Sequence, residues 1–553
     1  MTPKHTAWLP KHPLNPMNWL PEQLGSLRVL IIAALVLGIA FRFIHLDRKT
    51  YWIDETYTSL RLSGHTETEL VQTLFTGDVI GVDELLRYQR PDPATTLSDT
   101  LHSLATESPQ HPPLYYILGR WAMEWFGSSV AVPRGLAAIL SLPLLPAMYW
   151  LCWELFGSVT AAWIGVALVS ISPFHVLYAQ EAREYSFWAV TTVLSCAALL
   201  RAMRSRQRSD WLLYAATVAL GLYTFLFTVF INLGQAIYVA VLERWRWTKT
   251  TAAYVLSTII GCFAFLPWIW IILANWGRLH ETTAWTFSRR SLGYLMQRWL
   301  VGSSNLFFDF NLGYARLTGV TVILVALVVY AFFYCIRKSL SQVWLLIVTL
   351  TVIPAACLIV PDLVLGGVRS INPRYLVPTW IGMQLAVTYL ISAGIEVETR
   401  PKQPLNWGRI IFTVLFISSV VSCSVSSQAV LWWNKDFDKN QYNAWVASII
   451  NQADRPLVVA DDSKVASDCF ACRMMTLSYS LDPKVKLQLV LEPNAPKIPT
   501  GFSDILLLNT SKDLSKTIEK TTDYQVVRVF RDKQFLLQKL IQPSDVSAQE
   551  LES

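Results

Sequence analysis

Residues 317–336 read LTGVTVILVALVVYAFFYCI, a run without a single charged side chain. An α-helix of about 20 apolar residues is as long as the hydrocarbon core of a bilayer is thick. This stretch is therefore predicted to cross a membrane as one helix. Comparable runs occur along most of the chain, and they lie at 29–46, 136–153, 160–177, 186–203, 252–275, 343–361, 375–394 and 410–431.

The composition agrees with a membrane protein. Of 553 residues, 53% are hydrophobic and only 15% are charged, and the mean hydropathy is +0.37. Soluble domains carry about 25% charged residues, so the deficit is large. The 23 Trp and 21 Tyr suit the aromatic belts at membrane interfaces. These values exclude a soluble enzyme, a disordered chain and a fibrous repeat.

The positive charges indicate how the spans are oriented. The net charge of +7 gathers in short loops between apolar runs, which is typical of a topology signal and not of a nucleic-acid patch. Basic clusters at 201–208 and 244–249 flank the stretch 211–243, which is too long for one span. If both clusters are cytoplasmic, this stretch is a hairpin that turns outside near Tyr223-Thr224. Eleven spans follow, with an upper limit of 13, an N-terminus inside and a C-terminus outside.

Residues 113–126 are apolar but short, and Arg120 and Glu124 would make a full crossing costly. We expect a shallow helix on the outer leaflet there. The predicted fold is a polytopic α-helical membrane protein with a small extracytoplasmic α/β domain. Its parts are a cytoplasmic tail (1–28), a transmembrane domain (29–431) with a long outer loop (47–135), and the C-terminal domain (432–553).

The C-terminal domain is predicted from short apolar runs that alternate with turn-like and helix-like segments. Cys469 and Cys472 lie in this polar region, whereas the other six cysteines lie within or beside apolar segments. An extracytoplasmic setting is oxidising, so we expect a local disulfide between these two.

Two motifs in the outer loop carry candidate functional residues. Asp54 and Glu55 follow the first span, and adjacent carboxylates there can supply a general base or a metal ligand. Ordinary surface charges are the alternative. His111 lies in the stretch QHPPLYY at 110–116 and can contact an anionic headgroup. An interfacial His without a role is the alternative.

Two further motifs lie at outer ends of later spans. Residues 172–186 read SPFHVLYAQEAREYS and place three charges, two of them Glu181 and Arg183, in a tight turn. Burying them without purpose is expensive, although an internal salt-bridge cluster is the alternative. In the stretch RSINPRYL at 369–376, guanidinium groups match phosphate oxygens with forked hydrogen bonds. Snorkelling of these side chains is the alternative.

Together the four motifs resemble the C-type superfamily of membrane glycosyltransferases, in particular the bacterial protein O-mannosyltransferase and lipid A aminoarabinose transferase families. The resemblance covers residues 27–395. It implies a polyprenyl-phosphate donor that carries one sugar, and transfer on the outer face with inversion. The similar segments are LDRKTYWIDE at 46–55, HPPLYY at 111–116, SPFHVLYAQEAREYS at 172–186 and NPRYL at 372–376.

The resemblance also implies roles for individual residues. It places Asp54 at the active site with Glu55 beside it, and it maps Glu181 to a second outer-loop acid and His111 to a basic residue before an amphipathic helix. Relatives often have a His where this chain reads Tyr223-Thr224-Phe225. No metal ligands are assigned, and a divalent metal stays open as a cofactor. The residues expected to bind the donor phosphate or the substrate are His111, Arg183, Arg369, Arg374 and Tyr375.

The favoured interpretation is an inverting glycosyltransferase of a plasma membrane that acts on its outer face. It moves a monosaccharide to a hydroxyl of a protein, a lipid or a cell-wall glycan, with membrane lipids as partners and no nucleic acid. A flippase or transporter of lipid-linked glycans should show polar residues at mid-membrane depth and inward-facing gates, and the sequence indicates neither. A glycan polymerase or ligase would share the outer site. A receptor would explain only the C-terminal domain.

Overall fold

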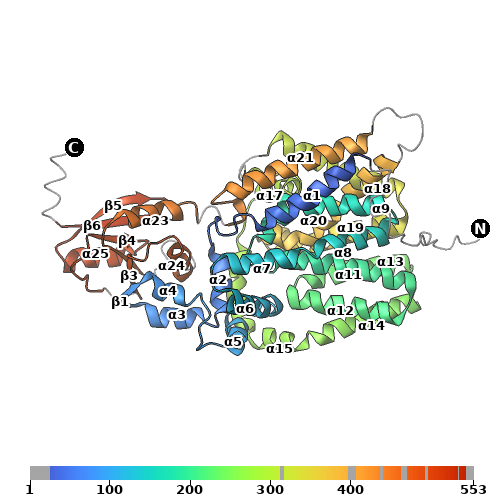
Figure 1. The fold of residues 1–553 in the computed structure, drawn as a ribbon. Helices are drawn as coiled ribbons and strands as arrows, with labels where there is room; N and C mark the ends of the chain where they lie inside the picture. Colours follow the sequence, from blue (N-terminus) through green and yellow to red (C-terminus); the bar gives the residue numbers. More distant parts are fainter. Residues whose placement is uncertain are drawn as a thin grey trace, which may run out of the picture. The chain divides into compact units, whose positions relative to one another are not determined.

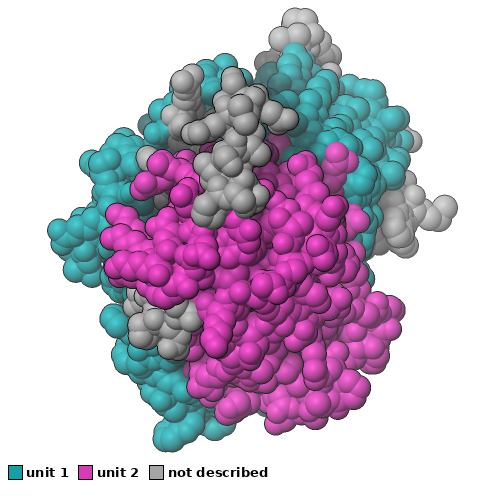
Figure 2. Space-filling view, turned by 90° about the vertical axis from the view of Figure 1, so that its left-hand side faces the viewer, with its two compact units in different colours: residues 1–46, 108–115, 134–429 teal, residues 47–107, 116–133, 430–553 magenta. Residues whose placement is uncertain are grey.

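The computed structural model describes residues 25–311, 317–396, 406–435, 440–461, 470–491, 496–532 and 535–542. The chain forms two compact units, shown in Figure 2. Unit 1 comprises residues 1–46, 108–115 and 134–429, and unit 2 comprises residues 47–107, 116–133 and 430–553. Each unit is described by itself. The predicted disulfide between Cys469 and Cys472 lies outside the described residues.

Most of unit 1 is made of apolar helices (Figure 1), as the hydropathy predicts. Among the described residues, six stretches are long and apolar enough to cross a membrane. They are Ala131–Phe156 (α7, Ala131–Ser141, with α8, Leu144–Phe156), α11 (Tyr185–Ser205), α18 (Gly319–Lys338), α19 (Ser341–Val364), Pro373–Glu396 (η3, Pro373–Leu376, with α20, Val377–Glu396) and α21 (Trp407–Gln428). Unit 1 also contains the helices α1 (Leu27–Phe43), α16 (Trp276–Thr283), η2 (Ala284–Phe287) and α17 (Leu292–Ser304).

Two further apolar stretches are bent. α9 (Val159–Ser170) meets α10 (Pro173–Ala179) at 56°, and α14 (Lys249–Ala264) meets α15 (Leu266–Ala274) at the same angle. Each second helix has a proline in its first two positions, and proline disfavours helical geometry in the residue before it. Counting each bent pair as one span raises the number of long apolar spans in the described part to eight. The eleven-span count stays a prediction.

The stretch 211–243 forms two helices, as expected for a hairpin. α12 (Arg208–Thr224) ends with the Tyr223-Thr224 pair, and three residues separate it from α13 (Thr228–Leu242). α13 has 15 residues and is apolar along its length. The break therefore falls where the flanking basic clusters predict a turn.

Small residues allow the helices of unit 1 to approach closely. A Cβ atom added to Gly382 of α20 would lie 2.1 Å from Thr351 Oγ1 of α19. One added to Gly38 of α1 would lie 2.3 Å from the backbone oxygen of Ser170 at the end of α9. Packing through small residues is a main source of helix association in membranes, where the hydrophobic effect does not drive it.

Unit 2 contains a six-stranded mixed sheet in the order β1-β3-β2-β4-β6-β5 (Figure 1). The central strand β2 pairs in parallel with β3 and β4, and the other neighbours are antiparallel. The edge strand β1 comes from the long outer loop, so the loop and the C-terminal domain share one sheet. The strands are β1 (Thr76–Gly81), β2 (Pro456–Asp461), β3 (Lys486–Val490), β4 (Asp504–Leu508), β5 (Gln525–Arg531) and β6 (Leu536–Ile541).

Both faces of this sheet are covered, because side chains alternate between faces along a strand. Val458 of β2 packs into the larger core, to which α2, α3, α4, α23 and α24 contribute. Its neighbours Leu457 and Val459 pack into the smaller core with Leu514 of α25. The helices of unit 2 include α2 (Ile53–Leu62), α3 (Glu67–Leu74), α4 (Val82–Arg87), α5 (Leu97–Glu107), η5 (Trp433–Lys435), α23 (Asn443–Gln452), α24 (Phe470–Ser478) and α25 (Lys512–Thr521).

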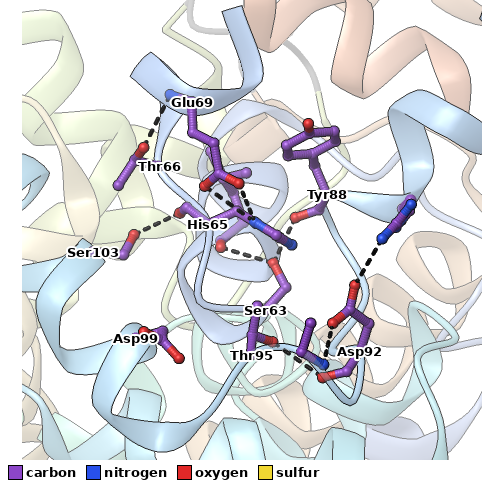
Figure 3. Close-up of polar contacts among 12 residues, drawn as sticks. Ser63, His65, Thr66, Glu69, Tyr88, Asp92, Thr95, Asp99 and Ser103 are labelled. Carbon is purple, nitrogen blue, oxygen red and sulfur yellow. Dashed lines mark hydrogen bonds and ion pairs between the residues drawn. The ribbon is translucent and has the colours of Figure 1, made fainter. Parts of the chain in front are cut away.

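Polar contacts hold the outer-loop part of unit 2 together (Figure 3). His65 Nδ1 lies 3.1 and 3.2 Å from the two carboxylate oxygens of Glu69, and its backbone oxygen accepts from Ser103 Oγ at 2.6 Å. Arg61 and Glu107 form a buried ion pair at 2.7 Å, which joins α2 to α5. These contacts connect α2, α3 and α5 within the loop.

The helix predicted for 113–126 forms as α6 (Leu114–Phe126). Within unit 2, Arg120 is buried and donates to the backbone oxygen of Leu62 at 3.2 Å and to Thr95 Oγ1 at 3.1 Å. Trp125 and Phe126 are 74% and 75% exposed. The charged Arg120 side chain, which would make a crossing costly, is thus hydrogen-bonded inside the protein. The exposed rings of Trp125 and Phe126 suit a membrane interface. A place on the outer leaflet stays a prediction.

Candidate active site

The charged turn at 180–184 lies in unit 1 between α10 and α11, and polar contacts fix it on both sides. Gln180 Nε2 donates to the backbone oxygen of Phe41 at 2.7 Å, at the end of α1. Ser186 Oγ donates to the backbone oxygen of Ala137 at 3.0 Å, in α7. These flanking residues of the motif are therefore structural, and they hold the charged residues between them in one conformation.

At the centre of the turn, Arg183 and Glu184 both contact His111. Glu184 Oε1 lies 2.8 Å from His111 Nδ1, and Arg183 Nη2 lies 3.0 Å from His111 Nε2. A guanidinium can only donate, so His111 Nε2 is the acceptor and His111 Nδ1 donates to Glu184. The contacts therefore favour the neutral imidazole with its proton on Nδ1. Both charged side chains are buried.

The ionisation of Glu184 follows from these neighbours. Burial alone would raise the pKa of Glu184, but the Arg183 guanidinium and the His111 ring outweigh it and hold this pKa at about 2. The carboxylate is consequently ionised at neutral pH and too weak a base for proton transfer there. Its role is to orient His111 and Arg183. Sequence reasoning did not assign Glu184 to the site, because nothing in the sequence distinguishes it from Glu181, the other acid of the same turn.

Two guanidinium groups converge on one aromatic ring. Arg183 Cζ lies 5.6 Å from the ring centroid of Tyr185, and Arg374 Cζ lies 5.5 Å from the same centroid. Arg374 also lies 5.4 Å from the ring of Tyr375. The aromatic rings attract each cation, and both guanidinium groups come from motifs at the ends of apolar segments. Phosphate oxygens match the guanidinium fork, so this pair suits a phosphate.

Aromatic residues from the helix break after α12 line the same cluster. Phe225 lies 5.5 Å from Tyr185 and 6.1 Å from Tyr375 between ring centroids, and Phe227 lies 5.2 Å from Tyr375. The segment in which relatives often have a His thus reaches the cluster with apolar rings in this chain. A contact of this segment with a substrate stays a prediction.

Arg369 is placed differently from Arg374. Its Nε lies 3.6 Å from Asp362 Oδ1, and its guanidinium lies 4.5 Å above the ring of Phe287. The backbone N–H of Ser370 donates to Asp362 Oδ2 at 2.6 Å. These contacts brace the loop before η3, which carries Arg374. A direct contact of Arg369 with substrate stays a prediction.

The acidic motif lies in unit 2, at the start of α2. Glu55 is fully buried, and its Oε2 accepts from Lys435 Nζ at 2.9 Å and from the backbone N–H of Trp52 at 3.4 Å. Asp54 is half-buried and lies in the first helical turn, where the helix dipole favours a carboxylate. The fold therefore uses Glu55 internally and leaves Asp54 more accessible. The sequence holds no local signal for Lys435, which is 380 positions from Glu55.

Within the described residues, no group of three or more His, Cys, Asp or Glu side chains is arranged to hold a metal ion. Guanidinium groups that suit an anion are present in the turn at 180–184 and in η3.

Comparisons with known proteins found a family model that matches one part of the chain and solved structures with a similar fold. A family model described as dolichyl-phosphate-mannose-protein mannosyltransferase matches residues 110–271. The structure is similar to ArnT from Cupriavidus metallidurans bound to undecaprenyl phosphate, with a TM-score of 0.53, 12% identity, and coverage of 93% of this chain and 98% of that chain. For apo ArnT from the same organism these values are 0.52, 13%, 94% and 98%.

An oligosaccharyltransferase from Archaeoglobus fulgidus in the apo form gives a TM-score of 0.48 and 12% identity, over 85% of this chain and 65% of that chain. No curated protein matches this chain by sequence. The likeness to ArnT shows a shared fold over nearly the whole chain.

Proposed function

We propose that the chain is a membrane glycosyltransferase of the C-type superfamily, and that it transfers a monosaccharide from a polyprenyl-phosphate donor to an acceptor hydroxyl, with inversion. The observation that carries this proposal is the convergence of Arg183 and Arg374 on the ring of Tyr185. ArnT, which has the same fold, has been solved with undecaprenyl phosphate bound. A phosphate on a polyprenyl chain is the anion that a membrane can deliver to such a pair.

The chemistry asks little of the protein beyond placing charges. The acceptor oxygen forms a bond to the anomeric carbon while the bond from that carbon to the phosphate oxygen breaks. The electron pair of the broken bond remains on the departing phosphate, and the acceptor proton goes to a carboxylate. Fixed cations stabilise the developing phosphate charge because they need not reorganise during the reaction.

Arg183 is held ready for this task by its neighbours. His111 Nε2 accepts from it, and Glu184 lies 3.7 Å from its Nε. The Glu184 carboxylate also holds the Arg183 guanidinium beside the His111 ring. We assign Arg183 and Arg374 to the phosphate, with His111 and Glu184 as their support, and Tyr375 to the wall of the site.

Asp54 is our candidate for the general base, with Glu181 as the next candidate. A carboxylate in this role takes the acceptor proton as the new bond forms, which typically contributes about 10²–10⁴-fold to the rate. Glu55 is bound to Lys435 and Glu184 is held ionised by its neighbours, so neither is suited to carry that proton. We place the reaction on the extracytoplasmic face of a plasma membrane. A protein, lipid or cell-wall glycan is the acceptor.

The test uses the full chain in lipid nanodiscs with a polyprenyl-phosphate sugar that is radiolabelled in the sugar. Membranes from a strain that lacks the protein serve as the acceptor source. Transfer predicts release of polyprenyl phosphate together with label in the acceptor fraction, and Arg374→Ala should lose both. Arg290→Ala is the matched control, because Arg290 also stacks on a tyrosine, at 5.9 Å from Tyr294, but is exposed. Movement of intact labelled donor across the bilayer without release of polyprenyl phosphate would indicate a transporter and refute the proposal.

A further inference from the structure

Contacts within unit 2 join the segment that carries the acidic motif to the part of the chain that follows α21, and three of them lie close to that motif. The backbone N–H of Thr50 donates to the backbone oxygen of Val430 at 2.8 Å. The rings of Tyr51 and Tyr479 lie 4.8 Å apart, edge to face. The third contact is the ion pair between Glu55 and Lys435.

We propose that Lys435 is a positioning residue for the transfer reaction, which holds Glu55 and thereby fixes the first turn of α2 and the carboxylate of Asp54. The inference rests on the proposed function. It assigns the C-terminal domain a task that the motifs do not reveal, namely to orient the catalytic carboxylate from outside the transmembrane domain.

The burial of this ion pair shows that it is more than a surface contact. The side chains of Lys435 and Glu55 are 1% and 0% exposed, and the Nζ–Oε2 distance is 2.9 Å. Removing two charges from water costs several kcal/mol per ion, so such a pair adds little stability over apolar residues of the same size. Breaking it from one side is strongly unfavourable, because the remaining charge is buried without its partner. A geometric role therefore explains the pair better than stability does.

Lys435 is itself connected to the sheet core. Its backbone oxygen accepts from Asn440 Nδ2 at 2.8 Å, and Asn443 Nδ2 donates to Asn440 Oδ1 at 2.9 Å. Asn443 opens α23, whose buried Val446 and Ile450 pack into the larger core of unit 2. Lys435 is thus connected through short links to the larger core of unit 2.

Glu55 transmits this position to α2 in two ways. Its carboxylate accepts the N–H of Trp52, which caps the helix start. It also directly follows Asp54, so a shift of the Glu55 backbone moves the Asp54 carboxylate with it. A displacement of about 1 Å in a reacting group can reduce turnover by about 100-fold, even when the substituted residue is far from the chemistry.

The experiment compares Lys435→Met with Lys539→Met. Lys539 belongs to the same sheet and pairs with Asp504 at 2.6 Å, but its side chain is 39% exposed and it joins β6 to β4. Lys435→Met should lower kcat by about 10- to 100-fold with little change in the KM of the donor, because the phosphate contacts lie in unit 1. Lys539→Met should leave both constants near the wild-type values.

Two further variants separate positioning from general damage. Lys435→Arg keeps a cation on Glu55 and should retain more kcat than Lys435→Met. The double variant Lys435→Met/Glu55→Gln removes the same contact from both sides, so it should lose about as much kcat as Lys435→Met alone. Equal kcat in Lys435→Met and Lys539→Met, or a double variant that is the product of the two single losses, would overturn the proposal.

Hydrogen exchange gives a readout that does not depend on turnover. In Lys435→Met the amides of the first turn of α2, residues 53–56, should exchange faster than in the wild type, and in Lys539→Met they should not. If the wild type transfers no sugar but this difference is present, the proposed function fails and the link between Lys435 and α2 stands. If the wild type is active and exchange at 53–56 is the same in both variants, the positioning role fails alone.

Discussion

Replacing Glu184 with Gln should destabilise unit 1 by an amount that the structure allows us to calculate. Glu184 is 1% exposed, and its neighbours lower its pKa from the ordinary 4.5 to about 2. A difference of one pKa unit corresponds to about 1.4 kcal/mol, so ionised Glu184 contributes about 3 kcal/mol to folding. The same figure is expected from breaking a buried ion pair on one side, which costs about 3–5 kcal/mol.

The effect has a defined pH dependence. The folded-state pKa of Glu184 lies below the unfolded value, so its contribution is complete above about pH 4.5 and is lost as the pH falls toward about 2. Glu184→Gln removes the titrating group. The difference in Tm between wild type and variant should therefore be constant between about pH 6 and 8 and shrink below about pH 4.5.

Thermal unfolding in detergent, followed by tryptophan fluorescence, measures this difference. Glu281→Gln is the matched control, because Glu281 is exposed and pairs only with Arg278 on the surface at 3.3 Å. Surface pairs contribute at most about 1 kcal/mol, so the control should keep nearly the wild-type Tm. The reasoning is refuted if Glu184→Gln unfolds at the same temperature as the control at pH 7. A Tm difference that persists unchanged to about pH 3 would refute it as well.

Three further predictions concern turnover, donor binding and topology. Asp54→Asn should reduce transfer by about 10²–10⁴-fold while donor binding persists, which single-turnover assays with a separate donor-binding measurement can check. Arg374→Ala should raise the Kd of polyprenyl phosphate more than Arg374→Lys does, because Lys keeps the charge but loses the fork; an unchanged Kd in the Ala variant would remove Arg374 from the phosphate site. A cysteine near Arg206 should be shielded from an impermeant thiol reagent added to intact cells, whereas one near Asp83 should react, and labelling near Arg206 would contradict the eleven-span arrangement.

The helices of unit 1 could be predicted because their signal is local. A run of about 20 apolar residues forms a helix in a membrane almost regardless of its neighbours, since every backbone group must bond within its own segment. The break between α12 and α13 could also be predicted locally, because basic clusters flank the stretch 211–243 on both sides. The bends before α10 and α15 also have a local cause in Pro173 and Pro267. The hydropathy pattern alone nevertheless predicts one continuous span for α9 with α10, and one for α14 with α15.

The sheet of unit 2 shows where local signals end. Its C-terminal strands are apolar and were expected, but β1 reads TGDVIG and carries little strand signal of its own. It pairs with β3 through contacts such as that of Ile80 with Leu487, about 400 positions away. Pairing over such distances depends on the packing of the whole unit. For that reason the sequence suggested a loop and a separate domain where one sheet joins both.

The motifs contain two pairs of acidic residues, and in each pair the fold uses one member. Glu55 is bound to Lys435 and Glu184 to His111 and Arg183, and these contacts fix both carboxylates in place. Sequence reasoning can locate such pairs, because several charges at the end of a span are rare. It cannot decide between the members, since Lys435 is 380 positions from Glu55 and His111 is 73 positions from Glu184. The proposal of Asp54 and Glu181 as candidate general bases therefore draws on contacts that only the folded chain reveals.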